Sequence, residues 1–174
     1  MKRFNLALLA LVVCTGAAQA ASEDVEMNLV TSQGIGQSIG HVKISETDKG
    51  LEFAPDLKAL PPGERGFHVH AMGSCEPAMK EGKPSAAEAA GGHLDPHKSG
   101  KHEGPEGHGH TGDLPVLVVD KDGNANKAVV APRLKKLDEV KGKALMIHVG
   151  GDNMSDKPEP LGGGGARFAC GVIK

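Results

Sequence analysis

His68 and His70 are the first residues along the chain whose types and spacing could perform metal chemistry. They lie in an apolar run, Gly66-Phe67-His68-Val69-His70, that has the character of a β-strand. Because alternate side chains of a strand share a face, the two imidazoles would project together, with Phe67 and Val69 on the opposite face. Two imidazoles on one face can ligate one metal ion, although so short a motif also occurs by chance.

Further histidines follow among glycines, and they strengthen the interpretation of His68 and His70 as metal ligands. Those that could act as ligands are His93, His102, His110 and His148, with Asp113 three residues after His110. Three histidines and an aspartate suit a closed four-coordinate zinc site, whereas an all-imidazole set suits copper(II). The alternative is a chance cluster of solvated loop histidines. The number of histidines beside glycine turns favours a transition-metal centre instead.

Short β-type segments separated by turns must position these side chains. The candidate strands are residues 25–31, 39–45, 51–53, 66–70, 114–119, 128–131, 144–149 and 167–173. About eight short strands with turn signals between them predict an all-β, eight-stranded antiparallel sandwich or barrel. Leu134, Leu137 and Val140 predict one short helical piece in residues 133–140.

Residues 72–112 have no regular apolar period, yet they contain 5 of the 9 histidines. A structureless segment of about forty residues inside a compact domain is unusual and is normally functional. Metal ligation and a disulfide are the available means of holding such a segment in shape.

The first 20 residues predict export. Lys2 and Arg3 precede an apolar run at 6–13, and Ala18-Gln19-Ala20 is a small-x-small cleavage motif. This pattern is typical of a cleavable signal peptide, and it is too short to remain as a membrane anchor. A lipoprotein acylated at Cys14 is the weaker alternative, because bulky Val13 precedes that cysteine.

Cleavage after Ala20 would leave residues 21–174 as a single domain in the periplasm. Cys75 and Cys170 would then be the remaining cysteines, and an oxidising compartment predicts one disulfide between them. Removing two positive residues leaves 18 Lys and Arg against 22 Asp and Glu, a net charge of −4. This mildly acidic balance does not fit nucleic-acid binding, which calls for a basic patch.

The motifs in this order resemble those of the copper–zinc superoxide dismutases, most closely the periplasmic enzymes of Gram-negative bacteria. The motifs that carry the resemblance are Gly66-Phe67-His68-Val69-His70, Gly91-Gly92-His93, His110-x-Gly112-Asp113, His148-Val149-Gly150-Gly151-Asp152 and Ala169-Cys170-Gly171-Val172-Ile173. The resemblance covers the chain after residue 20. It implies a Greek-key β-sandwich or barrel with long metal-binding and active-site loops.

The resemblance also implies a role for each residue of the site. The implied copper ligands are His68, His70, His93 and His148, and the implied zinc ligands are His93, His102, His110 and Asp113. His93 would bridge the two metals and carry a proton during turnover. Asp152 would orient one ligand of each metal, Arg167 would dock the superoxide anion, and Cys75 and Cys170 match the family disulfide.

The implied reaction is dismutation of two superoxide anions to oxygen and hydrogen peroxide, with copper alternating between oxidation states and zinc structural. This activity would serve antioxidant defence in the periplasm. Bacterial members of the family include both monomers and dimers, and because no long apolar stretch of the sequence calls for a dimer, we expect a monomer. Lys135 and Lys136 are candidates for steering the anion. His41, His97 and His108 have no counterpart and are expected to be exposed, and the four glycines at 162–165 predict either close backbone approach or mobility at the rim of the site.

Two other classes of protein were weighed against this one. A copper-storage protein would favour soft Met and Cys ligands, but here the methionines are dispersed and the cysteines are paired. A zinc hydrolase needs an open coordination position, and the implied zinc shell is full.

Overall fold

The computed structural model describes residues 21–174, and the predicted signal peptide with Cys14 lies outside the described residues. The described part is all-β and carries three short 3₁₀ helices. The strands are β1 (Ser22–Thr31), β2 (Gly34–Thr47), β3 (Gly50–Leu57), β4 (Gly63–Arg65), β5 (Phe67–His70), β6 (Ala78–Lys80), β7 (Lys83–Ser85), β8 (Leu117–Val119), β9 (Val129–Ala131), β10 (Ala144–His148) and β11 (Arg167–Val172). The helices are η1 (Glu88–Ala90), η2 (Leu137–Glu139) and η3 (Pro160–Gly163).

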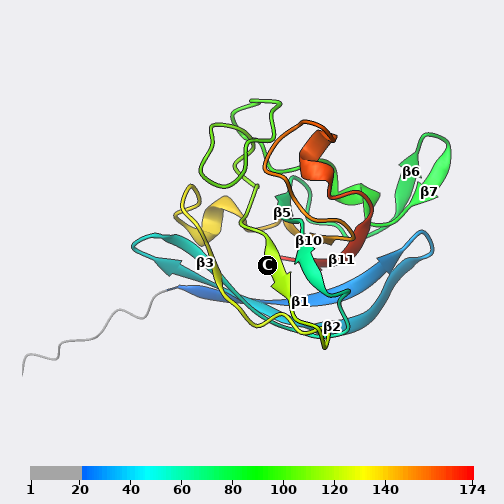
Figure 1. Ribbon diagram of the computed structural model, residues 1–174, viewed down its shortest axis with the longest axis horizontal. Coiled ribbons are helices and arrows are strands. Elements are labelled where there is room, and N and C mark those ends of the chain that lie inside the picture. Colours follow the sequence, from blue (N-terminus) through cyan, green and yellow to red (C-terminus); the bar gives the residue numbers. More distant parts are fainter. Residues whose placement is uncertain (1–20) are drawn as a thin grey trace, which may run out of the picture.

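Seven strands form one antiparallel sheet in the order β5-β10-β11-β1-β2-β3-β9. The last strand therefore pairs with the first, and β10 separates β5 from β11. Strands β4 and β8 form a small second sheet, and β6 and β7 form a separate hairpin. In Figure 1 the sheet curves from β1, β2 and β3 up to β5 and β10, with the long loops above. This arrangement confirms the predicted all-β antiparallel fold.

Burial alternates along the long strands, which is why they form one wall of a core. In β1, Val25 and Met27 are buried while the residues beside them face outward. Leu51 and Phe53 do the same in β3. This period of two is the signature of an antiparallel strand with one face on the core.

A pair of aromatic rings shows how far the sheet curls. Phe53 of β3 and Phe67 of β5 lie near opposite ends of the strand order, yet their ring centroids are 5.9 Å apart in an edge-to-face arrangement. Both side chains are fully buried, so the curled sheet closes around them. The core thus lies directly behind β5, the strand that carries His68 and His70.

Two expectations for local structure need correction. The three-residue strands β4, β6 and β7 were not predicted, because such short pieces leave no periodic signal. The helical piece expected at 133–140 is the single 3₁₀ turn η2. Within residues 21–174, no helix has the length and apolar character needed to cross a membrane.

Candidate metal centre

The free edge of β5 is covered by two segments of the long loop. The backbone of Val69 donates to Gly112 O at 2.9 Å and accepts from Leu94 N at 2.8 Å. These bonds place His93 opposite His70 and Asp113 opposite His68, as isolated antiparallel bridges. Backbone pairing between distant segments therefore brings the loop ligands to the strand ligands. Preferences of neighbouring residues in the sequence do not.

Gly112 permits this close approach. A Cβ at that position would lie 2.2 Å from Val69 O and 2.9 Å from Leu94 N. Real Cβ contacts are never that short, so any other residue would push the loop off β5 and carry Asp113 with it.

His148 enters from the opposite side of β5. It ends β10, whose neighbours in the sheet are β5 and β11, and it is in register with Arg167 of β11. His68 and His70 are buried, and Phe67 and Val69 on the other face belong to the core. The predicted alternation along residues 66–70 is therefore confirmed.

Two groups of potential ligand atoms result, each with its atoms within 4.8 Å of one another. The first group is His68, His70, His93 and His148; the second group is His68, His93, His102 and Asp113. His68 and His93 belong to both groups. His110 lies beside the second group, with its Nδ1 3.6 Å from Asp113 Oδ1.

Hydrogen bonds on the outer nitrogens fix how the first group faces inward. His70 Nδ1 donates to Gly91 O at 2.8 Å and His148 Nδ1 donates to Gly165 O at 3.2 Å. A carbonyl oxygen can only accept, so each Nδ1 carries the proton and each Nε2 keeps its lone pair. The two Nε2 atoms face each other at 3.4 Å.

Asp152 likewise fixes which ring nitrogen carries the proton in His68 and in His102. Its Oδ2 lies 2.7 Å from His68 Nε2 and its Oδ1 lies 2.8 Å from His102 Nε2. An ionised carboxylate only accepts, so His68 and His102 keep their lone pairs on Nδ1. A Cβ on Gly162 would lie 2.1 Å from Asp152 Oδ1, which confirms close backbone approach within residues 162–165.

Unpartnered buried atoms coincide with these lone pairs. The buried side-chain atoms without a hydrogen bond in residues 21–174 are His68 Nδ1, His102 Nδ1, His110 Nδ1, Asp113 Oδ2 and Thr111 Oγ1. His102 Nδ1 and Asp113 Oδ2 approach to 2.9 Å but lack hydrogen-bond geometry. Leaving buried polar atoms unpaired is costly, so four such atoms converging on one place fit bound metal cations.

Burial keeps three imidazoles of the first group, those of His70, His93 and His148, neutral and ready to bind. Removal from water is the largest cause that lowers the pKa of His148 to about 3, the pKa of His93 to about 4 and the pKa of His70 well below its usual range. Metal ligation needs the deprotonated imidazole, so these side chains do not have to release a proton at neutral pH.

Negative charge lies at the second group, on the carboxylate of Asp113 and on the neighbouring carboxylate of Asp152. Burial opposes ionisation of Asp113 and Asp152, but His102 and a second histidine beside each carboxylate outweigh it and lower the pKa of both carboxyls. Burial likewise opposes the charged form of His102, yet Asp113 and Asp152 raise the pKa of that imidazole to about 9. A metal ion at this position would take the place of that proton.

A cavity of about 160 Å³ opens on the first group. It is lined by His70, Lys80, Gly92, His93, His148, Pro160, Leu161, Gly165 and Arg167. Arg167 Nη2 donates to Gly91 O at 2.6 Å and Nη1 donates to Ala87 O, so η1 and its flanks hold the guanidinium in place. A cavity this small, with an arginine and a lysine in its wall, suits a small anion.

The two lysines predicted to steer the anion do not line the cavity. Lys136 pairs with Glu46 at 3.0 Å and the Lys135 ammonium donates to Lys49 O at 3.3 Å, and neither lines the cavity. Lys80 of β6 lines it instead. The sequence held no signal for Lys80, because the hairpin that carries it was not predicted. His41, His97 and His108 are exposed, as predicted.

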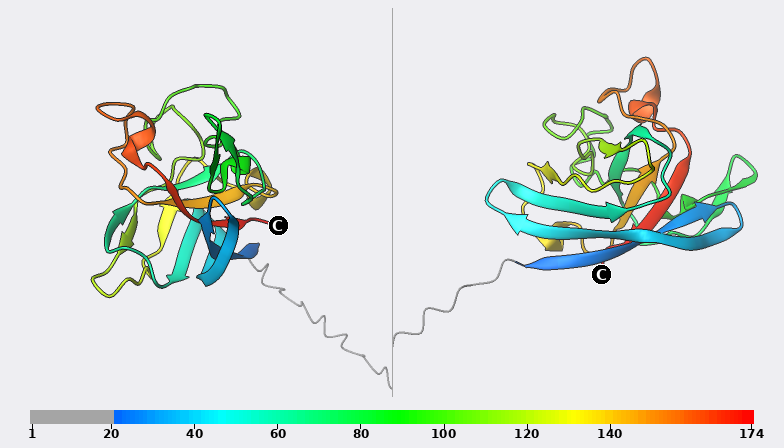
Figure 2. Two further views of the ribbon diagram at one scale, coloured as in Figure 1. Left: turned by 90° about the vertical axis from the view of Figure 1, so that its right-hand side faces the viewer. Right: turned by 60° about the horizontal axis from the view of Figure 1, so that its bottom comes forward.

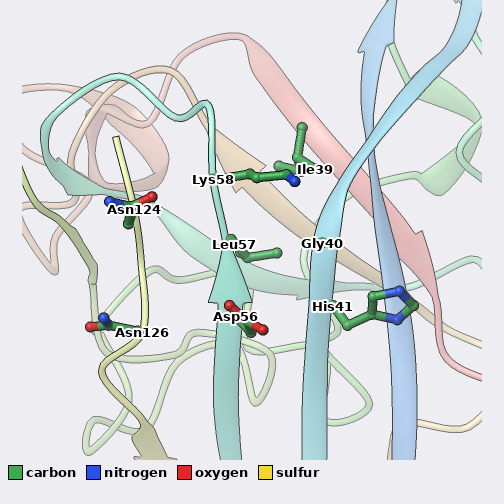
Figure 3. Close-up of a pocket in the computed structure, with 8 residues that line it drawn as sticks. All are labelled: Ile39, Gly40, His41, Asp56, Leu57, Lys58, Asn124 and Asn126. Carbon is green, nitrogen blue, oxygen red and sulfur yellow. The ribbon is translucent and has the colours of Figure 1, made fainter. Parts of the chain in front are cut away.

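A separate surface depression of about 310 Å³ lies between β2, β3 and residues 124–126 (Figure 3). Its polar side chains do not converge. His41 points toward β1, where it pairs with Asp24 at 3.0 Å, and away from Asn124 and Asn126. We assign it no chemistry.

Replacing Asp152 with asparagine is expected to weaken metal binding at both groups. The amide keeps the shape but offers only one acceptor oxygen, so either His68 or His102 loses the bond that sets its tautomer. Losing a partner of this kind typically costs about 10–100-fold in metal affinity. Competition with a chelator, measured for both metals, checks this. Exposed Asp122→Asn is the matched control, and unchanged affinity in Asp152→Asn would contradict the role.

The fold and the site together define an all-β protein with two adjoining groups of potential metal ligands that share His68 and His93. The family model for copper/zinc superoxide dismutase matches residues 38–173. A curated superoxide dismutase [Cu-Zn] of Escherichia coli (strain K12) is 78% identical over 174 residues, covering 100% of both chains.

Solved structures agree. A Cu/Zn superoxide dismutase from Brucella abortus is similar with a TM-score of 0.87 and 56% identity, covering 88% of this chain and 100% of that one. A monomeric copper, zinc superoxide dismutase from Salmonella enterica has a TM-score of 0.80 and 75% identity, with the same coverage of both chains. The chain belongs to the copper/zinc superoxide dismutase family.

Proposed function

We propose that this protein dismutates superoxide, converting two superoxide anions and two protons to oxygen and hydrogen peroxide. The observation that carries the proposal is the pair of ligand groups joined by His93 beneath a small cavity that Arg167 lines. When bound, copper supplies a one-electron couple that works in both directions, and zinc supplies fixed charge and rigidity. Family membership and the donor sets support the same assignment.

His68, His70, His93 and His148 would hold copper, since the first group is all imidazole. For zinc we assign His93, His102, His110 and Asp113, although His68 and not His110 lies within the second group. Because His68 Nε2 is bonded to Asp152, His68 has one free lone pair, on Nδ1, and the first group already needs it. His93 would serve both metals by losing both of its nitrogen protons, which leaves a lone pair on each ring nitrogen. His110 instead offers a buried Nδ1 without a partner, 3.6 Å from Asp113.

Arg167 and His93 have separate tasks in the reaction. Arg167 keeps its charge at any working pH and lines the cavity, where it attracts and orients the anion. His93 Nδ1 faces Asp113 at 2.8 Å, which leaves its Nε2 to face the first group. That nitrogen can take up a proton and release it to the peroxide, because forming hydrogen peroxide consumes two protons.

We also infer that the protein is exported to the periplasm as a monomer. Strand β1 begins at Ser22, directly after the predicted cleavage point, and the Cys75–Cys170 disulfide suits an oxidising compartment. The Salmonella enterica relative is described as monomeric. The intact mass of the secreted protein tests the cleavage, and sedimentation tests the monomer.

The test of the proposed function is superoxide dismutation by purified residues 21–174, measured together with copper and zinc content. Activity that rises in proportion to copper up to one equivalent, with one zinc, is the expected result. Both metals bound without activity would overturn the proposal and favour copper storage.

A further inference from the structure

The β6–β7 hairpin projects from the body of the protein, beside the turn that joins β1 and β2 (Figure 1; Figure 2, right). Its side chains are largely solvated: Met79 is 65% exposed and the Lys80 side chain 58%. A two-stranded hairpin is marginally stable by itself, so its position depends on its contacts with the body. Yet Lys80 of this hairpin lines the cavity over the first group.

Glu88 of η1 contacts both strands of the hairpin. Its Oε1 lies 3.7 Å from the Lys80 ammonium, and its Oε2 accepts a hydrogen bond from Ser85 Oγ at 3.5 Å. Among the residues described, Glu88 is the carboxylate within ion-pair distance of Lys80. The side chain of Glu88, which is 21% exposed, therefore links the hairpin to η1, in addition to the backbone bond from Ala89 N to Glu76 O at 3.1 Å at the base of the hairpin.

The same carboxylate lies 3.5 Å from Arg167 Nη1. Arg167 does not depend on it for position, because the carbonyls of Ala87 and Gly91 already hold its guanidinium. Lys80 has no such second anchor. Glu88 is thus within ion-pair distance of both Lys80 and Arg167, the two basic residues that line the cavity.

We propose that Glu88 is a positioning residue for anion capture, which fastens the β6–β7 hairpin to η1 and so keeps Lys80 at the cavity rim beside Arg167. The inference rests on the proposed function, in which the cavity admits a small anion. Glu88 brings a negative charge close to that path, and this charge by itself would slow the anion. Its contacts account for its position: without them, Lys80 loses its ion-pair partner and Ser85 loses its side-chain bond to η1, so the ammonium is held less closely at the cavity.

A double-mutant cycle separates position from charge. Potentials from fixed charges add, so if Glu88 acts only through its charge, Lys80→Gln lowers kcat/KM by the same factor whether or not Glu88 is present. If Glu88 positions Lys80, the factor shrinks in the Glu88→Ala background. We expect Lys80→Gln to lower kcat/KM at low ionic strength by about threefold with Glu88 present, and by less than half that with Glu88→Ala.

Glu81 provides a matched control. It is an exposed glutamate in the turn of the same hairpin, so Glu81→Ala changes the net charge equally while leaving the contacts of Glu88 in place. The Lys80 factor should be unchanged in the Glu81→Ala background. Glu88→Gln, which keeps an acceptor for Ser85, provides a second variant should Glu88→Ala alter metal content.

Two readouts do not depend on turnover. Azide affinity of the copper-loaded protein, followed by absorbance, should show the same non-additivity between positions 80 and 88. Amide hydrogen exchange across residues 78–85 should accelerate in Glu88→Ala and not in Glu81→Ala. Equal Lys80 factors in both Glu88 backgrounds, or no effect of Lys80→Gln at all, would overturn the proposal. Absence of dismutation in the wild type would instead sink the proposed function, while hydrogen exchange would still report on Glu88.

Discussion

The His148→Ala variant is expected to lose copper and superoxide dismutation together while keeping zinc. The substitution removes the Nε2 that faces His70 Nε2 at 3.4 Å and leaves the first group with three members. His148 does not belong to the second group, so zinc ligation is untouched. The loss should exceed the roughly 100-fold typical of removing a supporting partner, because a ligand itself is gone.

Dismutation rate and metal content, measured on the same preparation, check this result. Exposed His97→Ala is the matched control and should behave as wild type. Circular dichroism establishes that the variant is folded. A His148→Ala protein that keeps copper and full activity would show that copper is bound elsewhere.

Removing the Cys75–Cys170 disulfide is expected to have the largest effect on stability. The bond closes a loop with a sequence separation of 95 residues. Restricting the unfolded chain over such a loop is worth about 4–5 kcal/mol on the chain-entropy model. Both cysteines are buried, Cys170 completely, so serine at these positions also places hydroxyls in an apolar cluster.

Activity should fall as well, because the disulfide supports the anion site. The chain from Cys75 leads to η1, whose neighbouring carbonyls at Ala87 and Gly91 hold Arg167, and Cys170 follows Arg167 in β11. Urea unfolding of Cys75→Ser/Cys170→Ser against wild type, with both metals bound, gives the loss in stability. Wild type treated with a reductant is the companion sample and should match the variant. A loss below about 1 kcal/mol would mean that residual structure in the unfolded chain offsets the loop closure.

The sequence by itself determined the chemistry of the site and the strands on which it depends. The alternation in residues 66–70 placed His68 and His70 on one face and Phe67 and Val69 in the core, because strand geometry is local and has a period of two. The eight expected strands all exist, because short apolar runs between turn residues are a local signal. The order of the histidine motifs indicated the family, which the comparisons confirm. The ligand assignment itself stays a proposal.

Only the tertiary structure decided how the distant segments meet. His93 and Asp113 reach β5 through backbone bonds of Val69, and Asp152 reaches two histidines that are 34 residues apart in sequence. Lys80 lines the cavity on a hairpin too short to leave a periodic pattern, while Lys135 and Lys136 face elsewhere. Local propensity constrains only neighbouring residues, whereas these contacts depend on sheet register, on carbonyls whose direction follows from the fold, and on glycines that let backbones approach.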